Sequence, residues 1–124
     1  MLSSGQPSSF RWENYLTVAV HLSGLGDEAS LRSSVSRSYY YAFNLARVRL
    51  ALVPPIGAPP HPRAHGECWR EVEAQIGPQA AKLGRAMCSR RNNADYDLVE
   101  RNPRDWNFEA RTAISFARRI VKSL

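Results

Sequence analysis

The chain contains few of the residues and segments that most often identify a protein class. Its 124 residues include two cysteines, Cys68 and Cys88, and lack the second ligand pair that a zinc site requires. We therefore expect two reduced thiols. No run of about 18 apolar residues occurs, so we predict no membrane-spanning helix. Residues 1–7 carry no basic cluster ahead of an apolar stretch, which predicts no secretory signal and a cytoplasmic protein.

Catalytic motifs are equally scarce. The sequence has no glycine-rich phosphate loop and no assignable Ser-His-Asp set. The histidines His21, His61 and His65 form no pair or cluster with metal-ligand spacing, so we expect no metal and no cofactor. His65 opens a predicted helix, a position where anions bind readily, although a lone histidine is more often structural or solvated.

Lysine is the third scarce residue. Only Lys82 and Lys122 are lysines among 17 basic residues, and with 11 acidic residues the net charge is +6. Arginine makes bidentate contacts with phosphate and stacks on bases, so this balance favours an anionic partner such as RNA or a nucleotide. The alternative explanation is a GC-rich coding sequence, which replaces lysine with arginine without a functional cause.

The apolar pattern that is present has a helical period throughout. The length predicts one domain, with a flexible N-terminus at 1–8 and a helical domain at 9–124. No segment alternates with period two, so we predict no sheet. The predicted helices cover 10–23, 28–53, 63–76, 79–93 and 105–123, separated by a proline-rich loop at 54–62 and a loop at 94–104. The predicted fold class is an all-α, antiparallel four- to five-helix up-and-down bundle.

Local signals support several of these helix ends. Ser9 and Asp27 are expected N-caps of the first and second helices. Pro54 and Pro55 are expected to stop the second helix, and Pro78 suits the first turn of the fourth.

One face of the predicted second helix is polar. Its spacing of i, i+3, i+7 and i+10 brings together Arg37, Tyr40, Asn44 and Arg47. This face predicts either a surface that receives a phosphate or a partner helix, or an ordinary solvated face. The three consecutive tyrosines at 39–41 cannot all point into one core, because successive helical residues turn by about 100°.

Arg91 is the second polar feature. The apolar stripe of the fourth helix passes through Ala80, Leu83 and Met87 and continues to Arg91 or Ala94. A guanidinium beside the core needs a partner, and Asp95 follows one turn later. The pair is therefore either a structural salt bridge that ends the helix or a clamp for phosphate.

Three segments together resemble a known family. The segment Ser36-Arg37-Ser38-Tyr39-Tyr40-Tyr41-Ala42-Phe43 resembles the Ser-Arg-Ala-Tyr-Tyr-Ala-x-Phe signature of short prokaryotic HEPN-domain proteins. The dipeptide His65-Gly66 resembles the His-x-x-Val element of that group, and Arg91-x-x-Ala94-Asp95-Tyr96 resembles its Arg-x-x-Ala-Asp-Tyr element. Their order and spacing agree over residues 10–122.

The resemblance implies an up-and-down bundle that dimerises and forms a composite cleft at the dimer interface. Many HEPN proteins are metal-independent ribonucleases that act as toxins or in phage defence, often beside an antitoxin or a minimal nucleotidyltransferase. Others are inactive or bind nucleotides. In the nuclease branch a histidine follows the arginine after four to six residues, whereas this chain has Tyr96 after four. The pKa of histidine lies near neutral pH, whereas the pKa of an unperturbed tyrosine is about 10.

Two main hypotheses follow. In the first, a homodimer binds and cleaves RNA without metal: Arg91 stabilises phosphate charge, Asp95 orients Arg91, and Tyr96 and His65 contact the phosphate or the leaving oxygen. The expected nucleic-acid-binding residues are then Arg37, Tyr40, Asn44, Arg47 and Arg90. In the second, a non-catalytic module binds a nucleotidyltransferase-like or antitoxin partner, and the Arg-Asp-Tyr element is a structural lock. A helical scaffold without a specific ligand is a third possibility.

Overall fold

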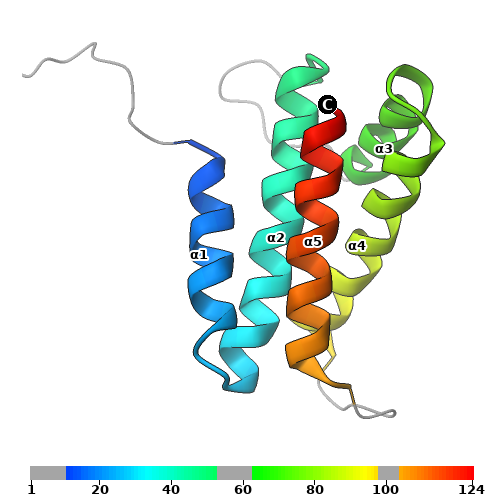
Figure 1. Ribbon diagram of the computed structural model, residues 1–124. Coiled ribbons are helices and arrows are strands. Elements are labelled where there is room, and N and C mark those ends of the chain that lie inside the picture. The colour runs from blue at the N-terminus through cyan, green and yellow to red at the C-terminus, as the bar shows by residue number, and fades with distance from the viewer. Residues whose placement is uncertain (1–10, 53–62, 98–103) are drawn as a thin grey trace, which may run out of the picture.

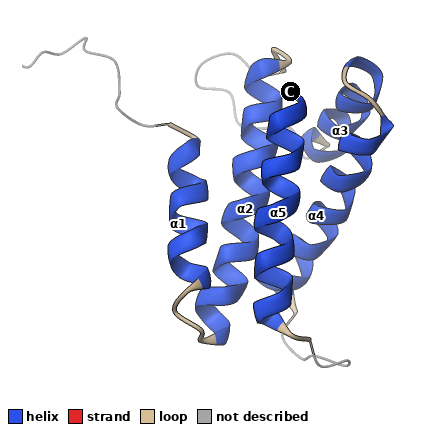
Figure 2. Ribbon diagram, viewed as in Figure 1, coloured by secondary structure: helices blue, strands red, loops and turns tan. Residues whose placement is uncertain are grey.

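The computed structural model describes residues 11–52, 63–97 and 104–124. Within these ranges every regular element is an α-helix and no strand is present, which confirms the predicted all-α bundle (Figure 2). The helices are α1 (Glu13–Ser23), α2 (Glu28–Arg49), α3 (Ala64–Gln75), α4 (Pro78–Tyr96) and α5 (Trp106–Ser123).

Helices α1 and α4 run in one direction and α2 and α5 in the opposite one, while α3, of 12 residues, lies beside one end of α4 (Figure 1). Helix α2 is central, because it contacts each of the other four helices. Helix α1 packs mainly on α2 and touches α5 much less. The polar face of α2 therefore lies between α1 and α4, while α5 covers another side of α2.

Three helix starts have clear local causes. The Asp27 carboxylate accepts the Ser30 backbone N–H at 3.0 Å, which confirms the predicted cap of α2. Asp105 caps α5 in the same way through the Phe108 N–H, at 3.1 Å. Pro78 occupies the first turn of α4 as predicted, after Gly77 with a φ of 147°. The predicted cap Ser9, the N-terminus at 1–8 and the loop at 54–62 lie outside the described residues.

The prediction that α2 continues to residue 53 is wrong, because the helix ends at Arg49. Ala51 adopts a left-handed φ of 57°. The Leu52 N–H then donates to the Arg47 carbonyl at 2.8 Å, and the Ala51 N–H donates to the Val48 carbonyl at 3.2 Å. These two bonds form a Schellman motif, which ends the helix before the prolines are reached.

The predicted end of α4 at residue 93 is also wrong, because the helix continues to Tyr96. The Arg32 guanidinium explains the extra turn. It donates to the carbonyls of Ala94 at 3.4 Å and Asp97 at 2.8 Å, so that carbonyls at the helix end have a partner. Asp95 and Tyr96 are therefore helical residues rather than part of a loop.

The core lies between α2, α3, α4 and α5. Its fully buried large side chains include Tyr39, Trp69, Met87 and Ile120. At Gly84 a Cβ atom would lie 2.2 Å from the Trp69 ring, so α4 approaches α3 closely only because this position has no side chain. The α4 stripe is buried through Arg91 and Ala94 as predicted. On α1, Val20 is 41% exposed.

Candidate functional site

Arg91 is the centre of the candidate site. Arg91 is 7% exposed. Its guanidinium carbon lies 5.4 Å from the Tyr40 ring centroid and 5.7 Å from the ring centroids of Tyr39 and Tyr96. Tyrosine faces attract a cation at such distances. Two of these rings come from α2 and one from the end of α4. The tyrosine-rich segment and the Arg-Asp-Tyr element, about 50 residues apart in the sequence, therefore meet in space.

The polar partners of Arg91 are incomplete. Its Nη1 lies 3.8 Å from Asp95 Oδ2, which is a long ion pair, and its buried Nε has no hydrogen-bond partner among the described residues. A buried guanidinium with unused donors is energetically costly. The predicted Arg91–Asp95 pair is thus present, but it does not satisfy the guanidinium by itself.

Asp95 is held from α2 as well as from α4. The Ser36 hydroxyl donates to Asp95 Oδ2 at 3.1 Å. Arg32, one turn earlier on α2, caps the end of α4 that carries Asp95. These contacts keep the carboxylate on the side of Arg91 that faces α1 and α2.

His65 approaches the same cluster from α3. Its Nδ1 lies 2.6 Å from the Tyr39 hydroxyl, and that hydroxyl accepts the Trp69 indole N–H at 3.1 Å. The imidazole stacks on Phe43 with ring centroids 4.3 Å apart. Burial, followed by the charges of Arg91 and Arg47, lowers the pKa of His65 below its ordinary value. The ring is therefore uncharged at neutral pH.

The Tyr39 hydroxyl that lies beside His65 stays protonated. Burial raises the pKa of Tyr39 far above its ordinary value, so the group does not ionise near neutral pH. The Tyr39 oxygen has a second lone pair besides the one that accepts from Trp69, so it can accept from Nδ1–H of the neutral His65 ring. In that tautomer Nε2 is unprotonated and can accept a proton from a ligand.

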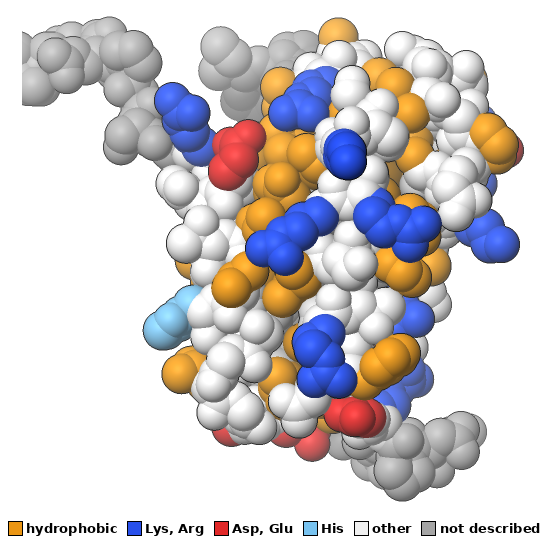
Figure 3. Space-filling view, in the orientation of Figure 1, with side chains coloured by type: hydrophobic (Ala, Val, Ile, Leu, Met, Phe, Trp, Pro, Cys, Tyr) orange, Lys and Arg blue, Asp and Glu red, His pale blue; other side chains and the backbone are white. Residues whose placement is uncertain are grey.

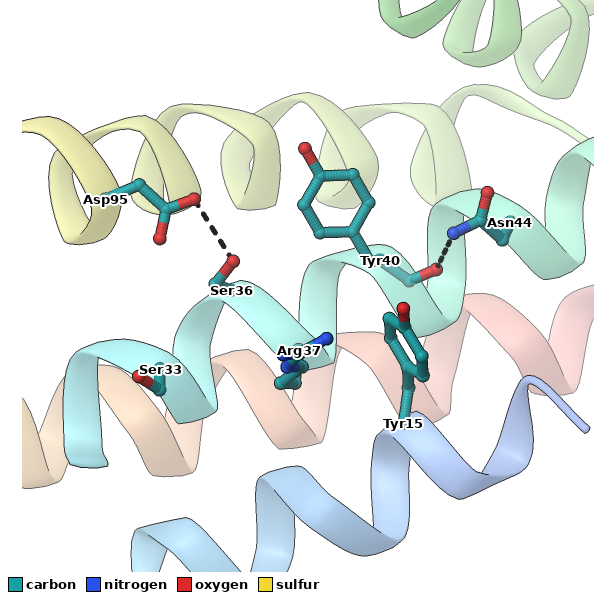
Figure 4. A pocket seen from close by; sticks show the side chains of 7 residues that line it. All are labelled: Tyr15, Ser33, Ser36, Arg37, Tyr40, Asn44 and Asp95. Carbon is teal, nitrogen blue, oxygen red and sulfur yellow. Dashed lines mark hydrogen bonds between the residues drawn. The ribbon is translucent and has the colours of Figure 1, made fainter. Parts of the chain in front are cut away.

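A groove of about 390 Å³ opens beside this cluster, between α1, α2 and α4 (Figure 4). We call it the α1–α2–α4 groove; it is lined by Tyr15, Ser33, Ser36, Arg37, Tyr40, Asn44 and Asp95. Arg37 is exposed, and its guanidinium carbon lies 5.0 Å from the Tyr15 ring centroid. The Asn44 amide donates to the Tyr40 carbonyl at 2.9 Å. The groove thus combines an exposed cation, two aromatic rings and several hydroxyl and amide groups.

The structure separates the other predicted residues. Arg47 lies over the Phe43 ring at 5.1 Å, near His65 rather than in the groove. Arg90 pairs with Glu109 of α5 at 2.6 Å, so its charge is already compensated on another side of α4. Tyr96 is 68% exposed beside Arg91.

Two contributors were missed by the sequence analysis. Tyr15 reaches the groove from α1, and Trp69 supports Tyr39 from α3. Neither residue carries a local signal for these roles, because both depend on how the helices pack.

Both cysteines are free, and burial raises the pKa of the Cys68 thiol to about 12. In the described ranges, no group of three or more His, Cys, Asp or Glu side chains could hold a metal ion. None of the helices that the structure describes is long and apolar enough to cross a bilayer.

Comparisons with known proteins give no family for this chain. No protein-family model matches it, and searches of curated proteins and of solved structures give no match either. The fold and the site define an all-α bundle with an arginine enclosed by tyrosines beside a polar groove.

Proposed function

We propose that the protein binds RNA or a nucleotide at the α1–α2–α4 groove and that, in the stronger form of the proposal, it cleaves RNA without metal. One observation carries this proposal. The nearly buried Arg91 has a single long ion pair and an unpartnered Nε, and it lies against residues that border an open groove. The resemblance to HEPN-domain proteins supports the same reading.

The groove offers complementary contacts to a nucleotide. Arg37 provides an exposed guanidinium for a phosphate. Tyr15 and Tyr40 provide aromatic faces on which a base can stack, a contact worth about 1–3 kcal/mol per base. The Asp95 carboxylate repels phosphate but accepts hydrogen bonds from ribose hydroxyls, so it favours a sugar at its end of the groove.

Cleavage requires a group that moves a proton near neutral pH, and His65 is our candidate. In this reaction the RNA 2′-oxygen attacks the adjacent phosphorus, and the bond from phosphorus to the 5′-oxygen breaks. The 5′-oxygen takes a proton from water, so the products are a 2′,3′-cyclic phosphate and a 5′-hydroxyl. The neutral His65 accepts the 2′-hydroxyl proton, and Arg91 with Arg47 stabilises the charge that develops on the phosphoryl oxygens. Tyr96 contacts the phosphate or the leaving oxygen.

The proposal has two further parts. The protein forms a homodimer with the groove at its interface, and it acts as a toxin or defence component. The second candidate function is a non-catalytic module that binds an antitoxin or nucleotidyltransferase-like partner. The enclosure of Arg91 by three tyrosine rings favours it, because such a residue also suits a structural lock.

The decisive experiment measures binding and cleavage of labelled single-stranded RNA in EDTA. We compare wild type with Arg91→Ala, Arg91→Lys, His65→Gln and the control Arg85→Ala, whose exposed side chain pairs with Glu73 at 2.7 Å. We expect cleavage to fall at least roughly 100-fold in Arg91→Ala and His65→Gln and to persist in Arg85→Ala. Circular dichroism separates loss of activity from loss of folding, and Arg91→Lys keeps the charge if Arg91→Ala does not fold.

The outcomes separate the two candidate functions. RNA binding without cleavage by wild type overturns the ribonuclease but keeps the binding site. If wild type binds neither RNA nor mononucleotides, the groove has another purpose and the partner-binding module is favoured. An expression assay adds a cellular readout: toxicity that Arg91→Ala removes and Tyr96→Phe retains assigns the effect to the arginine.

A further inference from the structure

The outer face of α5 carries cations without carboxylate partners. Arg111, Arg118 and Arg119 are exposed, and none forms an ion pair with an acidic side chain in the parts of the chain that the structure describes. By contrast, Arg85 and Arg90 on α4 are both paired. Like charges gathered on one helix repel one another, so this face gains from an anionic partner.

Apolar side chains lie among these cations. Figure 3 shows Lys and Arg side chains standing among hydrophobic ones over the face that carries α5. Val20 is 41% exposed on the α1 side, and Phe108 is 52% exposed near the start of α5. Protein interfaces are enriched in aromatic residues and arginine, and this face offers both.

The same face is concave on both sides of α5. Between α1 and α5 lies a hollow of about 450 Å³ lined by Val20, Ser23, Arg111, Ile114, Ser115, Arg118 and Arg119. On the α4 side lies a second hollow of about 430 Å³ lined by Arg90, Phe108, Arg111, Thr112, Ser115 and Phe116. Arg111 and Ser115 border both, so the two hollows form one continuous surface. We call it the α5 outer face.

We propose that the α5 outer face is a docking surface for an acidic amphipathic helix of a partner protein. Arg111 and Arg118 are seven residues apart, which is two helical turns, or roughly 10 Å along the axis. A helix lying along α5 can match them with carboxylates spaced by one or two turns. Its apolar side chains then enter the hollows beside Val20 and Phe108.

Other occupants fit this face less well. A second copy would set the same arginines against one another if it used the same face. RNA supplies charge for the arginines, but its phosphates leave the apolar hollows unfilled. An anionic lipid surface is flat, whereas this face is hollowed. The α5 outer face also shares no lining residue with the α1–α2–α4 groove, so the docking proposal does not depend on the proposed function.

The test is a selection from a library of displayed helical 16-residue peptides on the full chain. The target variant is Arg111→Glu/Arg118→Glu. The matched control is Arg70→Glu/Lys82→Glu, which reverses two exposed cations on α3 and α4 and lowers the net charge from +6 by the same amount. Circular dichroism melts establish that both variants fold.

We expect wild type to enrich peptides with Asp or Glu one or two turns apart and apolar residues between them. A synthetic copy of an enriched peptide should bind the target variant at least roughly tenfold more weakly than wild type and bind the control like wild type. Val20→Asp should weaken binding as well.

Three results overturn the proposal. One is that wild type enriches no peptide with this pattern. Another is that enriched peptides bind the target variant as tightly as wild type. The third is that single-stranded RNA or phosphatidylserine vesicles bind through Arg111 and Arg118 while no peptide is selected, which assigns the face to RNA or to a membrane.

Discussion

Arginine occurs in this protein in two contrasting settings. Inside the bundle, Arg91 lies under three tyrosine rings with Asp95 at 3.8 Å. On the outer face of α5, Arg111, Arg118 and Arg119 are exposed among apolar side chains and pair with no described carboxylate. Net charge alone therefore describes neither region. We expect Arg91 to contribute to the free energy of unfolding, whereas substitution of the α5 arginines should leave the fold intact.

The largest expected effect tests this contrast directly. Arg91→Ala removes a buried side chain that three rings and a carboxylate enclose, so we expect the free energy of unfolding to fall by about 2–4 kcal/mol. Arg118→Ala should change it by no more than about 0.5 kcal/mol. Urea titration of both variants gives the two values. Equal losses would show that Arg91 and Arg118 contribute equally to the free energy of unfolding.

Two glycines test how closely α3 and α4 pack, the two helices that carry Trp69 and Arg91. A Cβ at Gly84 would lie 2.2 Å from the Trp69 ring, whereas a Cβ at Gly66 would meet no described atom within 4 Å apart from its chain neighbours and the nearby backbone of its own helix. Gly84→Ala should therefore destabilise the protein by about 1–3 kcal/mol through overpacking. Gly66→Ala should stabilise it by up to about 1 kcal/mol, because alanine favours the helix.

Thermal melts measure both glycine variants. Displacement of Trp69 should also change the His65 imidazole resonances, because Trp69 donates to the hydroxyl that faces His65. Destabilisation by Gly66→Ala as large as that by Gly84→Ala would contradict the close approach of α3 and α4.

The third prediction concerns pH. Burial, with Arg91 and Arg47 nearby, places the folded-state pKa of His65 below its ordinary value of 6.5. The unfolded chain therefore binds more protons as the pH falls through 6.5 toward the folded pKa, and the free energy of unfolding decreases in that window. Stability curves of wild type and His65→Gln at several pH values should converge on acidification. A constant gap between them would refute the depressed pKa.

The smallest expected effect is at Ser36. Its hydroxyl makes one exposed hydrogen bond to Asp95, at 3.1 Å, so Ser36→Ala should cost about 0.5–1 kcal/mol. Ser33→Ala, on the same exposed side of α2, is the matched control. Chemical denaturation resolves the difference, and identical values would mean that Ser36 does not hold Asp95.

Much of the fold follows from local patterns. The helical period of the apolar residues, the Asp27 cap and Pro78 predicted the helices and most of their starts. The end of α2 was mispredicted because its left-handed residue is Ala51, where a glycine would have been the usual signal. The end of α4 was mispredicted because Arg32, more than 60 residues earlier, supplies the cap.

The candidate site was predictable only where neighbours in sequence are neighbours in space. The i, i+4 spacing predicted that Arg91 meets Asp95. Arg90 was also predicted to bind nucleic acid, although adjacent helical positions turn apart and Arg90 pairs with Glu109. Tyr15 and Trp69 enter through helix packing, which a single sequence does not specify. The roles assigned to these residues in RNA binding remain predictions.

The Arg32 cap has a consequence for how the molecule opens. A helix terminus normally frays, and its amides exchange rapidly with solvent. Here the last carbonyls of α4 are bonded to a side chain near the start of α2, so the final turn cannot unwind without breaking a link between distant parts of the chain. The amides of that turn should therefore exchange on the timescale of larger cooperative openings. The end of α4 that carries Asp95 would then belong to the slow-exchanging part of the bundle.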